Sequence, residues 1–359
     1  MREINNVSSA AAQMVEADDT LFDYHFRNTK GKIVPAVSVA GAPIADSHCH
    51  LDMLPHPELA LARARWHGIR FVVSVVDPSE DPDYTYQNLS SWQSQAAELL
   101  KVWANAEGRA GLAELAELVV PKLSESELPE LAPPKLSELQ SLAEMPELQA
   151  PHCRIIIGCH PHNASKYSDA LEAELRSYLK DQRTAAIGEI GLDYHYDASP
   201  RETQREVFGR QLALAKEYGL PVALHLREAH ADGLAILNQV GWPPAGVLLH
   251  CYTLGPRELQ PFLDRGAVVA FGGTLTFKKA DELRQTAAQT ALEKIMTETD
   301  APFMTPEPLR GTLCGPEHTL FTAARLAEIR SASQPEEVYQ LLTEVYQNAL
   351  AFFDQPRFA

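Results

Sequence analysis

The chain has 359 residues, of which 45% are hydrophobic and 22% charged, and its formal net charge is −17. This length can bury one barrel-sized core, and the composition is ordinary for a globular protein. The negative charge argues against a protein that holds nucleic acid by global attraction, although a few local basic groups or divalent ions could hold phosphates in a cleft. With no long apolar run and no apolar core at the N-terminus, no membrane anchor is expected, and the cytoplasm is the expected location.

Residues 1–42 are expected to form an extension before the main domain. Within them, two segments at 20–26 and 32–39 flank the sequence Asn-Thr-Lys-Gly at 28–31. A short turn sequence of this kind between two extended segments indicates a β-hairpin.

Eight short apolar runs follow, most of them separated by stretches with helical periodicity. The runs are residues 44–47, 71–76, 154–158, 184–188, 221–224, 245–249, 267–270 and 294–297. Strands that alternate with helices favour a parallel sheet, and eight such units predict an α/β fold, a (β/α)8 TIM barrel over 43–353, with a short tail at 354–359. An open doubly wound sheet is the alternative, but no GxGxxG motif follows the first strand to support it.

A segment rich in Leu, Glu and Pro, residues 106–150, interrupts this alternation before the third predicted strand. Its spacing predicts short helices broken by prolines, and eight glutamates accompany two lysines over 110–150. Because a helical stretch at 84–103 directly follows the second strand, the insertion should begin near the N-terminal face of the barrel. We therefore expect a protein-interaction surface or a lineage-specific addition rather than an active-site lid. The opposite would hold if the insertion preceded the true second helix.

Six side chains of types that bind metal ions occur where barrel strands should end. They are His48, His50, Glu189, His225, His250 and Asp300. His48 and His50 are two residues apart and therefore face the same side of a strand. Histidine and carboxylate ligands suit zinc, manganese, magnesium and similar ions. Six ligands exceed the need of one open zinc site, whereas two divalent ions that share a carboxylate would use them all, and such a pair activates water for hydrolysis.

The sequence around these residues resembles the TatD family of metal-dependent deoxyribonucleases, within the amidohydrolase-like metal hydrolases. The matching blocks are Asp-Ser-His-Cys-His-Leu-Asp at 46–52, Gly-Cys-His-Pro-His at 158–162, Gly-Glu-Ile-Gly-Leu-Asp-Tyr at 188–194, Leu-Pro-Val-Ala-Leu-His-Leu-Arg-Glu-Ala at 220–229, His-Cys-Tyr at 250–252, Glu-Thr-Asp-Ala-Pro at 298–302, and the continuation at 306–311. The resemblance spans 44–353 apart from the insertion. It implies cleavage of a phosphodiester by activated water, from a 3′ end of single-stranded DNA.

The resemblance also implies how the six ligands divide between two ions. The two histidines of the first strand and Asp300 would bind one ion, and the histidines of the fifth and sixth strands would bind the other. Glu189 would bridge both ions. Asp300 and Glu189 are also the expected catalytic residues, because an ionised carboxylate such as Asp300 can orient or deprotonate the attacking water.

Five more residues are expected near the centre. His162, Arg227 and Arg310 are candidates for contact with the substrate, although each could instead hold a neighbouring carboxylate or pack structurally. Arg227 follows a candidate ligand by two residues and so shares its side of the strand. His160 and Asp193 are expected to support the site without binding an ion, Asp193 by orienting a loop or a ligand histidine.

Fold and ligands do not determine the bond that is cleaved. A deacylase, an amidohydrolase or a small-molecule phosphoesterase could use the same activated water, and the acidic charge keeps these alternatives open. A third alternative is an interaction protein with a vestigial site, but the complete set of ligands argues against it. With the resemblance added, a metal-dependent 3′-5′ exodeoxyribonuclease or phosphodiesterase is the favoured expectation.

Overall fold

The computed structural model describes residues 24–106 and 149–355. Most of the predicted extension, nearly all of the predicted insertion and the end of the predicted tail lie outside the described residues. The protein-interaction role expected for the insertion therefore stays a prediction.

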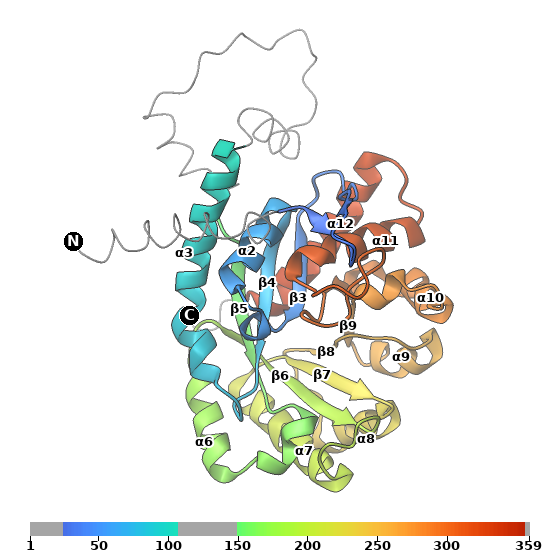
Figure 1. The fold of residues 1–359 in the computed structure, drawn as a ribbon. Helices are drawn as coiled ribbons and strands as arrows, with labels where there is room; N and C mark the ends of the chain where they lie inside the picture. Colours follow the sequence, from blue (N-terminus) through green and yellow to red (C-terminus); the bar gives the residue numbers. More distant parts are fainter. Residues whose placement is uncertain (1–23, 107–148, 356–359) are drawn as a thin grey trace, which may run out of the picture.

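Eight parallel strands form the centre of the molecule (Figure 1). They are β3 (Ile44–Cys49), β4 (Ile69–Val76), β5 (His152–Ile157), β6 (Thr184–Asp193), β7 (Val222–Arg227), β8 (Val247–Leu249), β9 (Val268–Phe271) and β10 (Ile295–Thr297). Each strand pairs with the next one in the chain, always in parallel. This order confirms the predicted (β/α)8 barrel.

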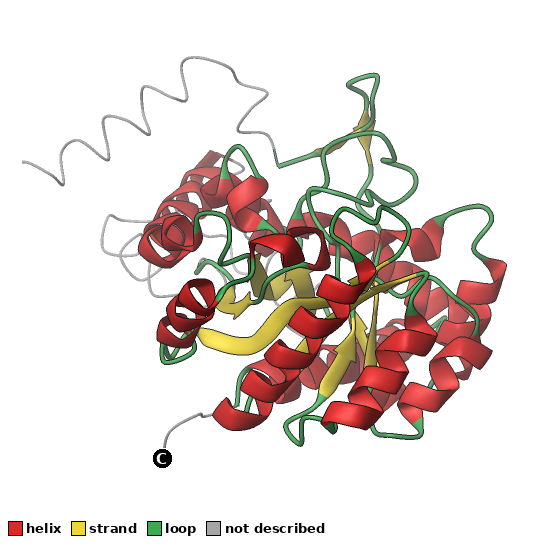
Figure 2. Ribbon diagram, turned by 90° about the horizontal axis from the view of Figure 1, so that it is seen from below, coloured by secondary structure: helices red, strands yellow, loops and turns green. Residues whose placement is uncertain are grey.

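Helices surround the strands, as the view in Figure 2 shows. They are α2 (Pro57–Trp66), α3 (Pro82–Ala106), α6 (Asp169–Tyr178), α7 (Arg201–Tyr218), α8 (His230–Val240), α9 (Pro256–Leu263), α10 (Asp281–Gln289), α11 (Thr319–Ile329) and α12 (Pro335–Phe353). Helix α7 illustrates their design, because Val207, Leu212 and Ala215 are buried on one side and Gly219 ends the helix in the left-handed conformation. Among the described residues, no helix is both long and apolar enough to cross a membrane.

Apolar side chains fill the inside of the barrel. Residues from all eight strands form one buried cluster: Ala45, Phe71, Val73, Val75, Ile156, Ala185, Ala186, Ala223, Leu248, Ala270 and Met296. Ala349 and Phe353 of α12 belong to the same cluster, so this helix covers one end of the barrel. The interior is therefore a packed core, and polar chemistry is confined to the end that α12 leaves free.

The first and last strands are joined by side-chain hydrogen bonds that complete the barrel. The buried carboxylate of Asp46 in β3 accepts hydrogen bonds from Thr299 N at 2.9 Å and from Thr299 Oγ1 at 2.6 Å. Thr297 Oγ1 in β10 donates to the carbonyl oxygen of Ala45 at 2.9 Å. Burial raises the pKa of Asp46 to about 7, although these hydrogen bonds lower it. These contacts bring the segment after β10 alongside the end of β3.

A two-stranded hairpin packs against the outside of the barrel. Strands β1 (Phe26–Arg27) and β2 (Ile33–Val34) are antiparallel, and Gly31, with a φ of 73°, donates its N–H to the carbonyl of Asn28 at 2.8 Å. The Phe26 ring lies 4.8 Å from the ring of Phe321 in α11. The hairpin thus contacts the helical layer through this pair of rings.

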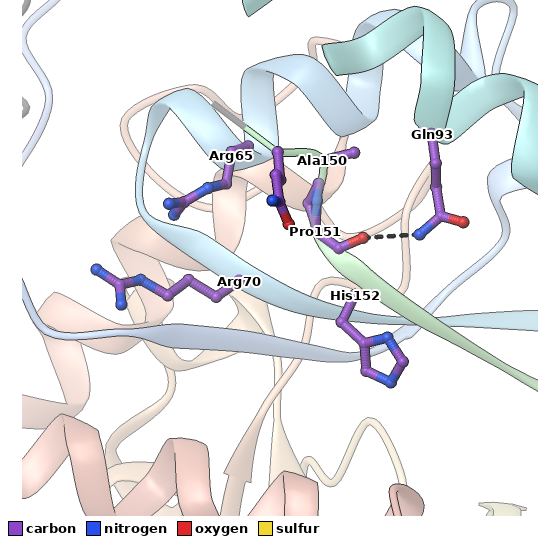
Figure 3. Close-up of a pocket in the computed structure, with 7 residues that line it drawn as sticks. Arg65, Arg70, Gln93, Ala150, Pro151 and His152 are labelled. Carbon is purple, nitrogen blue, oxygen red and sulfur yellow. Dashed lines mark hydrogen bonds between the residues drawn. The ribbon is translucent and has the colours of Figure 1, made fainter. Parts of the chain in front are cut away.

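A pocket of about 360 Å³ lies at the N-terminal ends of β4 and β5, where α2 ends (Figure 3). Its lining is Arg65, Arg70, Gln93, Gln149, Ala150, Pro151 and His152. The Gln93 amide donates to the carbonyl oxygen of Pro151 at 2.9 Å. The pocket contains none of the six predicted metal ligands.

We predict that Asp46→Ala destabilises the fold by about 2–4 kcal/mol, because it leaves two buried donors of Thr299 without an acceptor. Thr297→Val is the matched comparison, since it removes one hydrogen bond with little change of shape, and should cost about 1 kcal/mol. Urea unfolding followed by circular dichroism measures both. Equal losses for the two variants would contradict a special role for Asp46.

Candidate metal centre

The barrel brings all six predicted metal ligands together in one cluster, four of them at or just beyond the C-terminal ends of strands. His48 lies in β3 and His50 directly after it, whereas His250 follows β8 and Asp300 follows β10. The remaining two lie inside strands, because β6 and β7 continue in parallel register to Asp193 and Arg227, beyond the predicted ends at 188 and 224. The strand-end expectation for Glu189 and His225 was therefore wrong, although both side chains still reach the cluster.

One oxygen of Glu189 faces the histidines of the first strand. Its Oε2 lies 3.3 Å from His48 Nε2 and 3.8 Å from His50 Nε2. Asp300 faces the same two rings, because its Oδ1 is 3.9 Å from His48 Nε2 and 3.6 Å from His50 Nε2. Two carboxylates and two imidazoles therefore surround one small volume.

The other oxygen of Glu189 faces a different group of histidines. Its Oε1 lies 2.7 Å from His250 Nε2 and 3.4 Å from His160 Nε2, and it also contacts His225 Nδ1. The carboxylate thus divides the surrounding rings into two sets, one on each oxygen. This is the arrangement that a carboxylate bridging two ions requires.

The donor atoms fit divalent ions. Three groups have ligand atoms within 4.8 Å of one another: His48, His50 and Asp300; His48, His250 and Glu298; and His160, Glu189 and His225. His48 is fully buried, yet neither of its ring nitrogens has a partner with hydrogen-bond geometry, and His250 Nδ1 has none either. Buried polar atoms rarely remain unsatisfied, and a metal ion between His48 Nε2 and the Glu189 carboxylate would satisfy that nitrogen.

Charge balance explains how so many ionisable groups share this space. Burial lowers the pKa of His50 and His225, but the neighbouring carboxylates outweigh it and raise both values to about 9. Burial likewise opposes ionisation of Glu189, yet the surrounding histidines hold its pKa well below the usual range. The carboxylates thus attract positive charge into the centre, and either protons or metal ions can supply it.

Asp193 connects the centre to the loop after β6. Its Oδ2 lies 3.1 Å from His225 Nε2 and 2.9 Å from His162 Nε2. Its Oδ1 accepts the backbone N–H groups of His195 and Tyr196, both at 2.9 Å. Burial raises the pKa of Asp193, but these hydrogen bonds outweigh it and keep the carboxylate ionised. One carboxylate thus contacts both a candidate ligand and a loop, and the orienting role of Asp193 stays a prediction.

The two arginines predicted to contact substrate each lie over an aromatic ring. The guanidinium carbon of Arg227 is 4.7 Å from the ring centre of Tyr196, and that of Arg310 is 4.1 Å from the ring centre of Phe277. Arg227 is brought near the centre by the long pairing of β6 with β7.

Two residues lie closer to the centre than the sequence indicated. His160, expected only to support the site, contacts Glu189 as described above. Glu298 received no role, yet it is buried beside His250 Nδ1 at 3.8 Å, and its Oε1 accepts the N–H of Cys251. Burial and nearby carboxylates raise its pKa well above the usual range. The signal available in the sequence was the Glu-x-Asp pattern at 298–300, in which both carboxylates share one strand parity.

Known proteins resemble this chain over nearly all of its barrel. A family model described as TatD related DNase matches residues 45–354. The metal-dependent hydrolase YabD of Bacillus subtilis is 35% identical over 188 residues, which are 52% of this chain and 73% of YabD. A protein of Pantoea vagans named 3′-5′ ssDNA/RNA exonuclease TatD is 33% identical over 219 residues, which are 60% of this chain and 84% of that protein.

The structural comparison agrees with the sequence comparison. The crystal structure of YjjV, a TatD homologue from Escherichia coli K12, has a TM-score of 0.66 with this fold at 23% identity. The alignment covers 89% of this chain and 100% of YjjV, so the two proteins share the barrel. The match from residue 45 to residue 354 confirms the resemblance noted in the sequence: this chain belongs to the TatD family of metal-dependent hydrolases.

Proposed function

We propose that this protein is a 3′-5′ exonuclease or phosphodiesterase that cleaves single-stranded DNA with two divalent metal ions. The observation that best supports two ions is the division of the histidines between the two oxygens of Glu189. The proposed substrate is supported by the family and by the name of the Pantoea vagans relative, which specifies single-stranded DNA and RNA.

In this proposal the ligands divide as the geometry around Glu189 suggests. His48, His50 and Asp300 would hold one ion, His225 and His250 would hold the other, and Glu189 would be their shared ligand. When bound, the two ions would acidify a water molecule and neutralise charge on the phosphate and the leaving oxygen. His160 faces the same oxygen of Glu189 as the second set and would contact either that ion or the substrate.

Asp300 is proposed to accept a proton from the attacking water. Burial opposes its ionisation, but His50 and the neighbouring histidines lower its pKa, so it is available as a base near neutral pH. On the side of β6 and β7, His162 and Arg227 would contact the phosphate, and Arg310 would do so from the loop after β10. A few local cations of this kind allow an acidic protein to hold a phosphodiester.

We expect Glu189→Ala to reduce cleavage of end-labelled single-stranded DNA by about 100-fold or more, because it removes the shared ligand. Glu293→Ala, which changes an exposed glutamate outside the cluster, should retain full activity. The same metal-loaded proteins are tested on a generic phosphodiester and on a panel of esters and amides. Metal-dependent hydrolysis of esters or amides, with DNA left intact, would show that the proposed substrate is wrong.

Metal content tests the centre itself. After loading with excess metal and desalting, we expect about two ions per chain by elemental analysis, and about one for a variant that loses one set of ligands, such as His48→Ala combined with His50→Ala. Circular dichroism confirms that the variant is folded. Fewer than one ion bound to the unaltered chain would contradict a two-metal centre.

A further inference from the structure

Exposed apolar side chains gather around the metal centre. The large hydrophobic residues with high exposure in the described structure are Ile33, Met53, Tyr84, Val102, Tyr196, Phe303, Leu313 and Tyr339. Half of them, Met53, Tyr196, Phe303 and Leu313, lie on segments that follow β3, β6 or β10, at the end of the barrel that carries the centre. Exposed apolar groups concentrated around a polar site indicate contact with a ligand that has apolar surfaces of its own.

Tyr196 is held in place without being buried. Its side chain is 60% exposed, although its backbone N–H is bound to Asp193. Its ring centre lies 5.4 Å from that of His162, and the Arg227 guanidinium lies over the ring. The ring is therefore oriented by its neighbours while much of its surface remains accessible.

Phe303, on the segment that follows β10, is likewise held by its backbone while its ring stays partly exposed. Its side chain is 49% exposed, and its ring centre is 6.2 Å from that of His50. Its backbone N–H donates to the carbonyl oxygen of Asp300 at 2.9 Å, in a turn that begins at a candidate ligand. About half of this large apolar residue is exposed to water beside charged groups. Contact with an apolar part of a ligand would account for this position.

The two rings lie on opposite sides of the centre. In the order of the eight strands, β6 and β10 are four positions apart, which is halfway around the barrel. A row of rings, each centre 3.9–6.2 Å from the next, crosses the mouth between them: Phe303, His50, His48, His250, His225, His160, His162 and Tyr196. The candidate metal ligands occupy the middle of this row, and the two exposed aromatic rings occupy its ends.

We propose that Tyr196 and Phe303 are stacking platforms for the two nucleobases that flank the phosphodiester to be cleaved. The inference rests on the proposed function and adds two substrate-binding residues to it. Stacking tolerates any base, because every base has a π-face. It also favours single strands, since the bases of a duplex are already stacked on one another. In a chain with a net charge of −17, it supplies affinity that does not depend on attraction to phosphate.

The test combines variants of the rings with substrates that lack single bases. Tyr196→Ala and Phe303→Ala should each raise KM for a single-stranded oligonucleotide by roughly tenfold and leave kcat nearly unchanged, because stacking contributes to binding. Two further substrates carry an abasic deoxyribose in place of the last or of the penultimate base. Each variant should match the unaltered enzyme on the substrate that lacks the base its own ring would stack, because there is then no contact to lose.

Controls separate stacking from a structural effect. Tyr196→Phe and Phe303→Tyr keep an aromatic ring and should keep the original KM. Tyr339→Ala, which removes a 45% exposed ring on α12, should change nothing. An unchanged KM in both alanine variants, or a rise in KM that persists on both abasic substrates, would overturn the stacking proposal while DNA cleavage itself stands. Failure of the unaltered, metal-loaded enzyme to cleave any oligonucleotide would overturn the proposed function and the stacking proposal with it.

Discussion

The centre depends on the contact between the first strand and the segment after the last one. Asp46 receives both donors of Thr299, and the chain then continues so that the Asp300 N–H donates to the carbonyl oxygen of His48 at 2.9 Å. One step further, His50 N–H donates to the carbonyl oxygen of Ala301 at 2.7 Å. Two histidines from the start of the barrel and a carboxylate from its end are thereby held together. No local segment could supply this set, because its members are about 250 residues apart in the chain.

Glu189 stands on the far side of this junction and joins two halves of the site. Its low pKa is a consequence of the histidines around it, and the high pKa of His50 and His225 is a consequence of the carboxylates. Glu189 and these two histidines therefore each favour the charged form of the other, and a metal ion can replace the protons on the histidines. Asp193 extends this balance outward, because it contacts His225 with one oxygen and holds the loop of Tyr196 with the other. The chemistry of the centre and the surface that surrounds it are parts of one hydrogen-bonded network.

Much of this arrangement could be predicted from the sequence, for physical reasons that can be named. The spacing of His48 and His50 gives both the same strand parity, and eight alternating units can close only as a barrel or extend as an open sheet. The exact extent of β6 could not be predicted, since it depends on pairing with β7 as far as Asp193, and apolar periodicity does not report pairing. His160 was expected near the centre only as a supporting residue, and its contact with Glu189 could not be predicted, whereas the Glu-x-Asp pattern at 298–300 offered a signal for Glu298. His160 follows β5 and Glu298 follows β10. Whether either side chain reaches the centre depends on the direction of the backbone after the strand, which the local sequence does not determine.

The packed interior of the barrel determines how the substrate can enter the site and how the products can leave it. Apolar side chains fill the space beneath the centre, and Phe353 of α12 belongs to that filling. In the part of the chain that the structure describes, the centre therefore opens in one direction only. Under the proposed function, a strand cannot be threaded through the barrel, so the shortened strand and the released nucleotide must leave by the opening through which the substrate arrived. Each round of cleavage then requires the mouth to be cleared before the next phosphodiester can reach the ions.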